Sequence, residues 1–357
     1  MRITFLSPTL NMGGGIKVIA IHANYLVGKG HEVLVVSVPS QRPKLRTRIK
    51  NAFKGKFFYT RIHKSHFDNT VIKQHVIDKN RPILSSDLPD ADIIIATWWE
   101  TAEWLANIDD SKGKKVYFIQ GHEIFDFIPR QRAVETYQSN IHKIVVSNWL
   151  KEIMQKEYAA ENVDIVYNGL DKQQFCYTER DKQKVPTLGF LVSTASLKGI
   201  DTAIKVVNQV KKTYPSLKVI TFGMAKLDAS EFAALNADFY LLPSQSMIKD
   251  IYSSCDVWLA PSRTEGFNLT AIEAMSCGTP VVSTKTGWPA EAIISYYNGV
   301  LAEIDDFEGL TNGVNWLLGQ TNDSWKQLAK SAAKTTDGYS WEKASSQFEH
   351  ILLNCLD

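Results

Sequence analysis

Short apolar runs alternate with stretches of helical periodicity along most of the chain. In the first half, buried strands are predicted at 3–7, 33–36, 93–95, 116–119, 144–146 and 165–167; in the second half, at 188–192, 219–222, 240–242, 257–259 and 281–282. The first run leads through three glycines into a helical stretch at 16–27, and residues 307–353 read as helical throughout. Strands that alternate with helices predict parallel βαβ units.

A polar seam divides this pattern into two halves. Asn168-Gly169 is a turn signal, and residues 171–186 are charged without a clear period. We therefore predict an α/β protein with two doubly wound, Rossmann-like domains, one at 1–180 and one at 181–340. A final helix is predicted at 341–357, and it could pack back on the first domain. Two facing domains of this kind would bind a ligand in one cleft at the carboxyl ends of their strands.

The composition is that of an ordinary water-soluble protein. Of 357 residues, 44% are apolar and 22% are charged, and 40 Lys and Arg nearly balance 38 Asp and Glu. This balance argues against nucleic acid as the main ligand. No apolar run reaches the roughly 18 residues of a membrane span, and the first ten residues lack the charged leader and cleavage site of a signal peptide. Four unpaired cysteines suit a reducing cytoplasm. The predicted location is therefore the cytoplasm, and the alternative is peripheral contact with the inner face of the cell membrane.

Two segments of the sequence could bind a phosphate-bearing ligand. The glycines at 13–15 lie between a strand and a helix, where backbone N–H groups can approach a phosphate, although a plain tight turn is the alternative. Neither the dinucleotide fingerprint nor the Gly-Lys-Ser/Thr of a Walker A loop is present. Glu265 and Glu273 are eight residues apart at a second strand-to-helix junction, where a helix begins near Asn268. They can face one cleft and accept hydrogen bonds from hydroxyl groups; two solvated surface acids are the alternative.

The order and spacing of several segments resemble the family 4 retaining glycosyltransferases, which have the GT-B fold. The likeness covers most of the chain and rests on the window 261–275, the glycine loop, Ser147 in "VVSNWLK", residues 168–171, Lys198-Gly199, Pro261-Ser262 and the "GxxxE" at 287–291. The segments "ATWWETAEWL" and "YFIQGHEIFDFIP" are also similar, more weakly, to rhamnan-type rhamnosyltransferases of this family.

The resemblance implies that the GT-B fold divides into an N-terminal acceptor domain at 1–180 and a C-terminal nucleotide-sugar domain at 181–340. It also implies a role for each matching residue of the second half. Glu265 would contact the donor-sugar hydroxyls near the reacting carbon, and Glu273 would hold the nucleotide ribose. Lys198 would neutralise the diphosphate, whose charge grows as it leaves. The diphosphate would also bind the backbone N–H groups of Asn268 and Leu269 and the Thr194 hydroxyl. The base would lie beside Gly223 and Leu242.

The first half contributes glycines and a histidine under the same resemblance. Gly14 and Gly15 would approach the phosphates. His122 matches the family's active-site histidine and would hydrogen-bond the donor sugar, while Glu123 could orient its ring or cap a helix. A histidine with a purely structural role is the alternative. Trp98 and Trp99 could stack on sugar rings of the acceptor, or pack in the core.

Three positions depart from the family pattern. Ser193 stands where many members carry an arginine, so diphosphate binding would depend on Lys198 and on hydroxyls such as Thr194. Asn268 stands where members often have glycine. Gly287-Trp288 replaces a glycine pair, which could narrow the acceptor or sugar pocket.

A basic arm at 42–64 carries Arg46, Arg48, Lys50 and Phe57 among other basic and aromatic residues. This mixture suits an anionic membrane surface or a lipid-diphosphate acceptor, RNA, or a solvated loop. Asp90 and Asp92 precede their strand, so we expect a turn there and no catalytic metal or cofactor.

The sequence thus predicts a retaining hexosyl- or rhamnosyltransferase that uses a nucleoside-diphosphate sugar and a glycan or lipid-linked acceptor in surface polysaccharide or glycoconjugate synthesis. The alternative is a non-catalytic protein that binds anionic lipid or RNA through the basic arm. An epimerase or phosphorylase on the same fold is a third option.

Overall fold

The computed structural model describes residues 1–40, 64–68, 70–125, 128–224 and 234–356. Within them, one sheet has seven parallel strands in the order β3-β2-β1-β4-β5-β6-β7. Their bounds are β1 Arg2–Ser7, β2 Glu32–Ser37, β3 Lys73–Val76, β4 Ile93–Ala96, β5 Lys114–Ile119, β6 His142–Val145 and β7 Val163–Ile165. β4 is buried along its whole length, which explains its continuous apolar sequence, because helices cover both faces of a doubly wound sheet.

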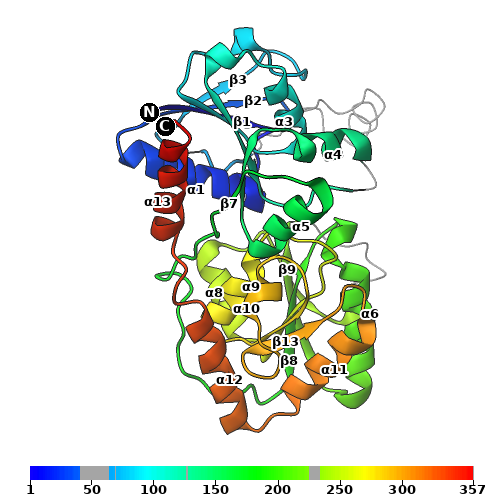
Figure 1. The fold of residues 1–357 in the computed structure, drawn as a ribbon. Coiled ribbons are helices and arrows are strands. Elements are labelled where there is room, and N and C mark those ends of the chain that lie inside the picture. The colour runs from blue at the N-terminus through cyan, green and yellow to red at the C-terminus, as the bar shows by residue number, and fades with distance from the viewer. Residues whose placement is uncertain (41–63, 69, 126–127, 225–233, 357) are drawn as a thin grey trace, which may run out of the picture. The chain divides into compact units, whose positions relative to one another are not determined.

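The helices of this first sheet come from both ends of the chain (Figure 1). They are α1 Gly14–Gly28, α3 Trp99–Ala106, α4 Arg130–Gln138, α5 Asn148–Tyr158 and the terminal α13 Trp341–Asn354. Phe348 of α13 is fully buried, and its ring lies 6.3 Å from that of Phe5 and 5.0 Å from that of Phe118. The end of the chain therefore completes the hydrophobic core around its beginning.

The second sheet has six parallel strands in the order β10-β9-β8-β11-β12-β13. Their bounds are β8 Thr187–Val192, β9 Lys218–Gly223, β10 Asp238–Leu241, β11 Val257–Ala260, β12 Val281–Thr284 and β13 Gly299–Ala302. The accompanying helices are α6 Ile200–Thr213, α8 Gln245–Ser253, α9 Leu269–Ser276, α10 Pro289–Ala292, α11 Phe307–Leu318 and α12 Asn322–Thr335. Buried side chains of β8, β11 and β12 form one core with the inner faces of α6 and α11.

The chain divides into two units, and each is a doubly wound parallel α/β fold, as predicted. The first unit comprises 1–145, 154–166 and 345–357, and the second comprises 146–153 and 167–344. The boundaries predicted at residues 180 and 340 differ from these bounds. The prediction used polar, turn-forming stretches of the sequence, whereas the units are defined by which residues pack together. A change of unit within α5 leaves no trace in the hydrophobic pattern, because a helix keeps one periodicity along its length.

Some elements differ from the sequence prediction. β3 has no apolar run, because all four of its residues are exposed at the edge of the sheet. β13 begins with a glycine, which weakens its strand signal. β7 ends at Ile165 and does not extend to Tyr167. The stretch 307–353 is not wholly helical, since it is divided into α11, α12 and α13 by turns.

Candidate functional site

The predicted donor-binding residues of the second unit follow the carboxyl ends of neighbouring strands. Thr194 and Lys198 follow β8, Gly223 ends β9 and Leu242 follows β10. Glu265, Asn268, Leu269 and Glu273 follow β11. Because every strand of this sheet is parallel to its neighbours, these positions share one edge of the sheet. We call this set the carboxyl-edge cluster.

At the centre of the cluster, Lys198 forms an ion pair with Glu265. The Lys198 ammonium lies 2.7 Å from both Glu265 carboxylate oxygens, and the Ser262 hydroxyl donates to Oε1 at 2.7 Å. Glu265 is 9% exposed, whereas the Lys198 side chain is 34% exposed. The acid is therefore sheltered and fully coordinated, while the lysine retains access to solvent.

Two glycines with positive φ let the backbone approach this ion pair. Gly199 has φ +65, and a Cβ on it would lie 2.0 Å from the Pro261 carbonyl oxygen. Gly287 has φ +57, and its Cβ would come within 3.0 Å of the Glu265 Cβ. A side chain at Gly199 would push the Lys198 segment away from Pro261, and one at Gly287 would crowd Glu265 itself.

Asn268 occupies the N-cap of α9 in the left-handed region, with φ 75 and ψ 71. Its side-chain oxygen accepts a hydrogen bond from the backbone N–H of Ala271. Glycine adopts this conformation without strain and asparagine tolerates it, so Asn268 keeps the backbone shape of the family's glycine and adds a cap. The first N–H groups of α9 have no partner within the helix, as at any helix start.

Glu273 lies inside α9 and is 8% exposed. The Tyr252 hydroxyl of the adjacent helix α8 donates to Glu273 Oε2 at 2.9 Å. Burial, followed by the nearby Glu273 charge, raises the pKa of Tyr252 well above its ordinary value, so this hydroxyl keeps its proton. Sequence reasoning missed Tyr252, because nothing in the hydrophobic pattern distinguishes it from a core tyrosine.

Two further family positions support the loop that carries Glu265. The buried Ser147 hydroxyl donates to the Gly266 carbonyl at 2.6 Å. Glu291 accepts from the Asn148 N–H at 3.0 Å and from the Tyr167 hydroxyl at 2.8 Å.

Trp288 is fully buried, and its ring contacts those of Phe267 and Tyr339. The ring of Trp288 therefore belongs to the core of the unit.

In the first unit, the glycine loop and the segment after β5 lie together. The Gln120 amide donates to the Gly15 carbonyl at 3.2 Å. A Cβ on Gly14 would meet nothing within 4 Å, and a Cβ on Gly15 would meet only Gln120, at 3.6 Å. Packing within the unit does not require these glycines, so their missing side chains leave space at the start of α1.

His122 follows β5 by three residues and remains partly exposed. Its Nε2 lies 2.6 Å from the hydroxyl of Tyr158, the last residue of α5. Burial, helped by the charge of Arg130, lowers the pKa of His122 to about 4, so the ring is neutral near pH 7.

Glu123 performs a different task from its neighbour. Its buried carboxyl accepts a hydrogen bond from the Trp99 N–H at 2.8 Å and lies 3.3 Å from the Tyr117 hydroxyl. Glu123 therefore caps the start of α3. Burial raises the pKa of this carboxyl to about 8.

The two predicted tryptophans lie in different environments. Trp99 is 3% exposed, with the Arg132 guanidinium 5.2 Å from its ring centre. Trp98 is partly exposed, and its ring lies 6.1 Å from that of Phe125. Of these two tryptophans, Trp98 alone presents an accessible ring for stacking.

The basic arm falls outside the described residues, together with its predicted acceptor or membrane residues Arg46, Arg48, Lys50 and Phe57.

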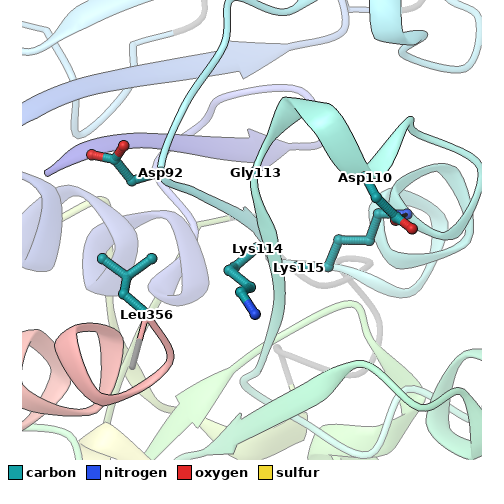
Figure 2. Close-up of a pocket in the computed structure, with 6 residues that line it drawn as sticks. All are labelled: Asp92, Asp110, Gly113, Lys114, Lys115 and Leu356. Atoms are coloured by element: carbon teal, nitrogen blue, oxygen red, sulfur yellow. Dashed lines mark ion pairs between the residues drawn. The ribbon is translucent and has the colours of Figure 1, made fainter.

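The opposite, amino-terminal edge of the first sheet holds a separate polar hollow of about 680 Å³ (Figure 2). Asp92, Asp110, Gly113, Lys114, Lys115 and Leu356 line it. Lys115 pairs with Asp110 at 2.8 Å, and Asp92 accepts from the Arg2 N–H at 2.6 Å. Asp92 thus ties the start of β4 to the start of β1, and no turn is assigned at residues 90–92. Among the described residues no group of three or more His, Cys, Asp or Glu side chains could hold a metal ion, and no helix is long and apolar enough to cross a membrane.

Residues 177–335, which provide the carboxyl-edge cluster, match the profile of the family "Glycosyl transferases group 1". Over these residues the chain is similar to the glycosyltransferases of that group. A glycosyltransferase of Haemophilus influenzae without an assigned substrate is 24% identical over 98% of this chain and 99% of its own length. A D-inositol 3-phosphate glycosyltransferase of Rhodococcus opacus is 27% identical over 56% of this chain. The match covers 50% of that relative's length.

Solved structures with a similar fold match nearly the whole chain. HepE of Anabaena, crystallised with UDP and glucose, has a TM-score of 0.73 at 18% identity, over 99% of this chain and 100% of that one. Sucrose-phosphate synthase of Thermosynechococcus elongatus has a TM-score of 0.72 at 15% identity, over 99% and 98%. At such identities the likeness concerns the fold, which is the predicted GT-B class.

Proposed function

We propose that this chain is a retaining glycosyltransferase that moves a hexosyl or rhamnosyl group from a nucleoside-diphosphate sugar to a glycan or lipid-linked acceptor, in surface polysaccharide or glycoconjugate synthesis. The observation that carries the proposal is the Lys198–Glu265 pair at the carboxyl edge of the second sheet, where Glu273 also follows β11. The match of 177–335 to group 1 glycosyl transferases supports it.

In this proposal the donor breaks the Lys198–Glu265 ion pair and binds both side chains. The diphosphate attracts the partly exposed Lys198 ammonium away from Glu265, and the N–H groups at the start of α9 add positive potential. Glu265 then accepts hydrogen bonds from sugar hydroxyls, while Ser262 continues to hold it. Glu273, fixed by Tyr252, accepts from the ribose hydroxyls. Thr194 adds a hydroxyl near the diphosphate.

The transfer step forms a bond from the acceptor oxygen to the anomeric carbon and breaks the bond from that carbon to the diphosphate oxygen. The acceptor approaches on the face that the diphosphate leaves, so the anomeric configuration is retained. The acceptor's proton passes to a diphosphate oxygen, which requires no protein base. Lys198 stabilises the charge that develops on the leaving group.

Calorimetry with UDP, dTDP and GDP tests the donor half of the proposal. HepE was crystallised with UDP, so UDP is the first nucleotide to test. We expect one of the three to bind with a Kd in the micromolar range, and Lys198→Ala to weaken it at least tenfold. Lys330→Ala, an exposed lysine on α12, is the matched control and should bind like the wild type. If none binds at millimolar concentration, the donor assignment is wrong.

A second experiment tests the chemistry. With a binding nucleotide identified, NMR of the product from the matching α-linked sugar donor should show an α linkage, whereas a β linkage would refute retention. If no nucleotide binds but anionic vesicles or RNA bind in a manner that requires 42–64, the non-catalytic alternative replaces this proposal.

A further inference from the structure

Three tyrosine and carboxyl groups surround His122 in the first unit, and each acts on a different part of it. The Tyr137 hydroxyl accepts from the Glu123 N–H at 2.8 Å and lies 3.4 Å from the Gly121 carbonyl. It thereby fixes the backbone on both sides of His122. The Glu123 carboxyl is occupied by the start of α3. The Tyr137 ring packs 6.1 Å from the imidazole ring, and the Tyr158 hydroxyl makes a hydrogen bond with that ring, at Nε2.

The 2.6 Å contact between Tyr158 and His122 has a chemically preferred direction. A neutral imidazole has one N–H donor and one acceptor nitrogen. A phenol hydroxyl is a much stronger acid than an imidazole N–H, so the hydrogen bond is best made with the phenol as donor and Nε2 as acceptor. The hydrogen bond at one ring nitrogen determines where the ring proton resides. The proton of the ring then lies on Nδ1.

We propose that Tyr158 is a positioning residue, which holds His122 as the Nδ1–H tautomer so that the ring offers the donor sugar a hydrogen-bond donor at Nδ1. This inference rests on the proposed function and specifies how His122 serves it. In water, a histidine side chain favours the proton on Nε2, so the arrangement reverses the default state of the ring.

The surroundings keep both partners in the protonation states that this hydrogen bond needs. Burial lowers the pKa of His122, so that the ring carries a single proton near pH 7. Burial, followed by the charge of Glu157, raises the pKa of Tyr158, so that the hydroxyl remains a donor. The Tyr158 and Tyr137 rings lie 5.0 Å apart, and this contact restricts rotation of the Tyr158 ring.

Nitrogen NMR of protein labelled at histidine reads the tautomer without any sugar transfer. The chain has 8 histidines, and loss of a signal in His122→Ala assigns the resonance of interest. We expect a protonated Nδ1 and an unprotonated Nε2 in the wild type, and a shift toward Nε2–H in Tyr158→Phe. An Nε2–H tautomer in the wild type would overturn the proposal, even if the variant did not fold.

Kinetics test the consequence for the reaction. Tyr158→Phe should lower kcat about tenfold while the donor Kd changes less than about twofold. In a His122→Ala background the same change should have no further effect, because Tyr158 acts through the ring. Tyr214→Phe, which removes a hydroxyl in the second unit, is the control. An equal loss of activity in both backgrounds would refute positioning, and absence of any transfer by the wild type would refute the proposed function while leaving the tautomer result intact.

Discussion

Replacing Glu123 by glutamine should make the stability of the protein less sensitive to pH. The buried carboxyl has a pKa of about 8, raised by burial from an ordinary value of 4.5. Between these two values the folded state holds a proton that the unfolded chain has lost. Folding therefore takes up a proton, and the stability of the wild type falls as pH rises through this window.

The size of the effect follows from the width of the window. Each pKa unit corresponds to about 1.4 kcal/mol, so this single carboxyl lowers the free energy of unfolding by about 3 kcal/mol between about pH 5 and about pH 7.5. Glutamine is neutral throughout. The Trp99 N–H and the Tyr117 hydroxyl both donate to the same carboxyl oxygen, and the glutamine oxygen can accept from both, so the cap of α3 is preserved.

Urea unfolding of the wild type and Glu123→Gln at the two pH values provides the measurement. We expect the variant to gain about 3 kcal/mol relative to the wild type at the higher pH, within a factor of two. Glu161→Gln, an exposed glutamate of the same unit, is the matched control and should differ from the wild type equally at both pH values. A wild type that gains stability over the variant as pH rises would show that Glu123 is ionised and favourably paired, contrary to this reasoning.

Three further predictions concern the proposed donor site. Glu273→Gln should weaken nucleotide binding about tenfold by calorimetry, because the ribose loses a charged acceptor; unchanged affinity would remove Glu273 from the site. Asn268→Gly should unfold in urea within about 0.5 kcal/mol of the wild type, whereas Asn268→Ala should lose about 1–2 kcal/mol through its positive φ and lost cap; equal stabilities would contradict the left-handed conformation. Gly15→Ala should keep the thermal midpoint of the wild type, since its Cβ meets nothing closer than 3.6 Å, yet reduce transfer; a fully active variant would show that no ligand approaches there.

The local pattern was sufficient to predict the class of fold. Buried strands of parallel sheets read as continuous apolar runs, so β1, β4, β5, β8 and β11 were found from the sequence. β3 was missed because its exposed residues, Lys73 to Val76, have no apolar run. The residues at the carboxyl ends could be proposed as one edge without coordinates, because parallel strands bring these ends together.

What the sequence determined by itself is therefore the alternation of elements and the sheet edge at which candidate residues gather. Tertiary structure alone decided the partners. Lys198 and Glu265 are 67 residues apart, His122 and Tyr158 are 36 apart, and Tyr252 and Glu273 are 21 apart. Periodicity reports which face of an element is buried, whereas a hydrogen bond between distant elements depends on how their side chains meet when the elements pack.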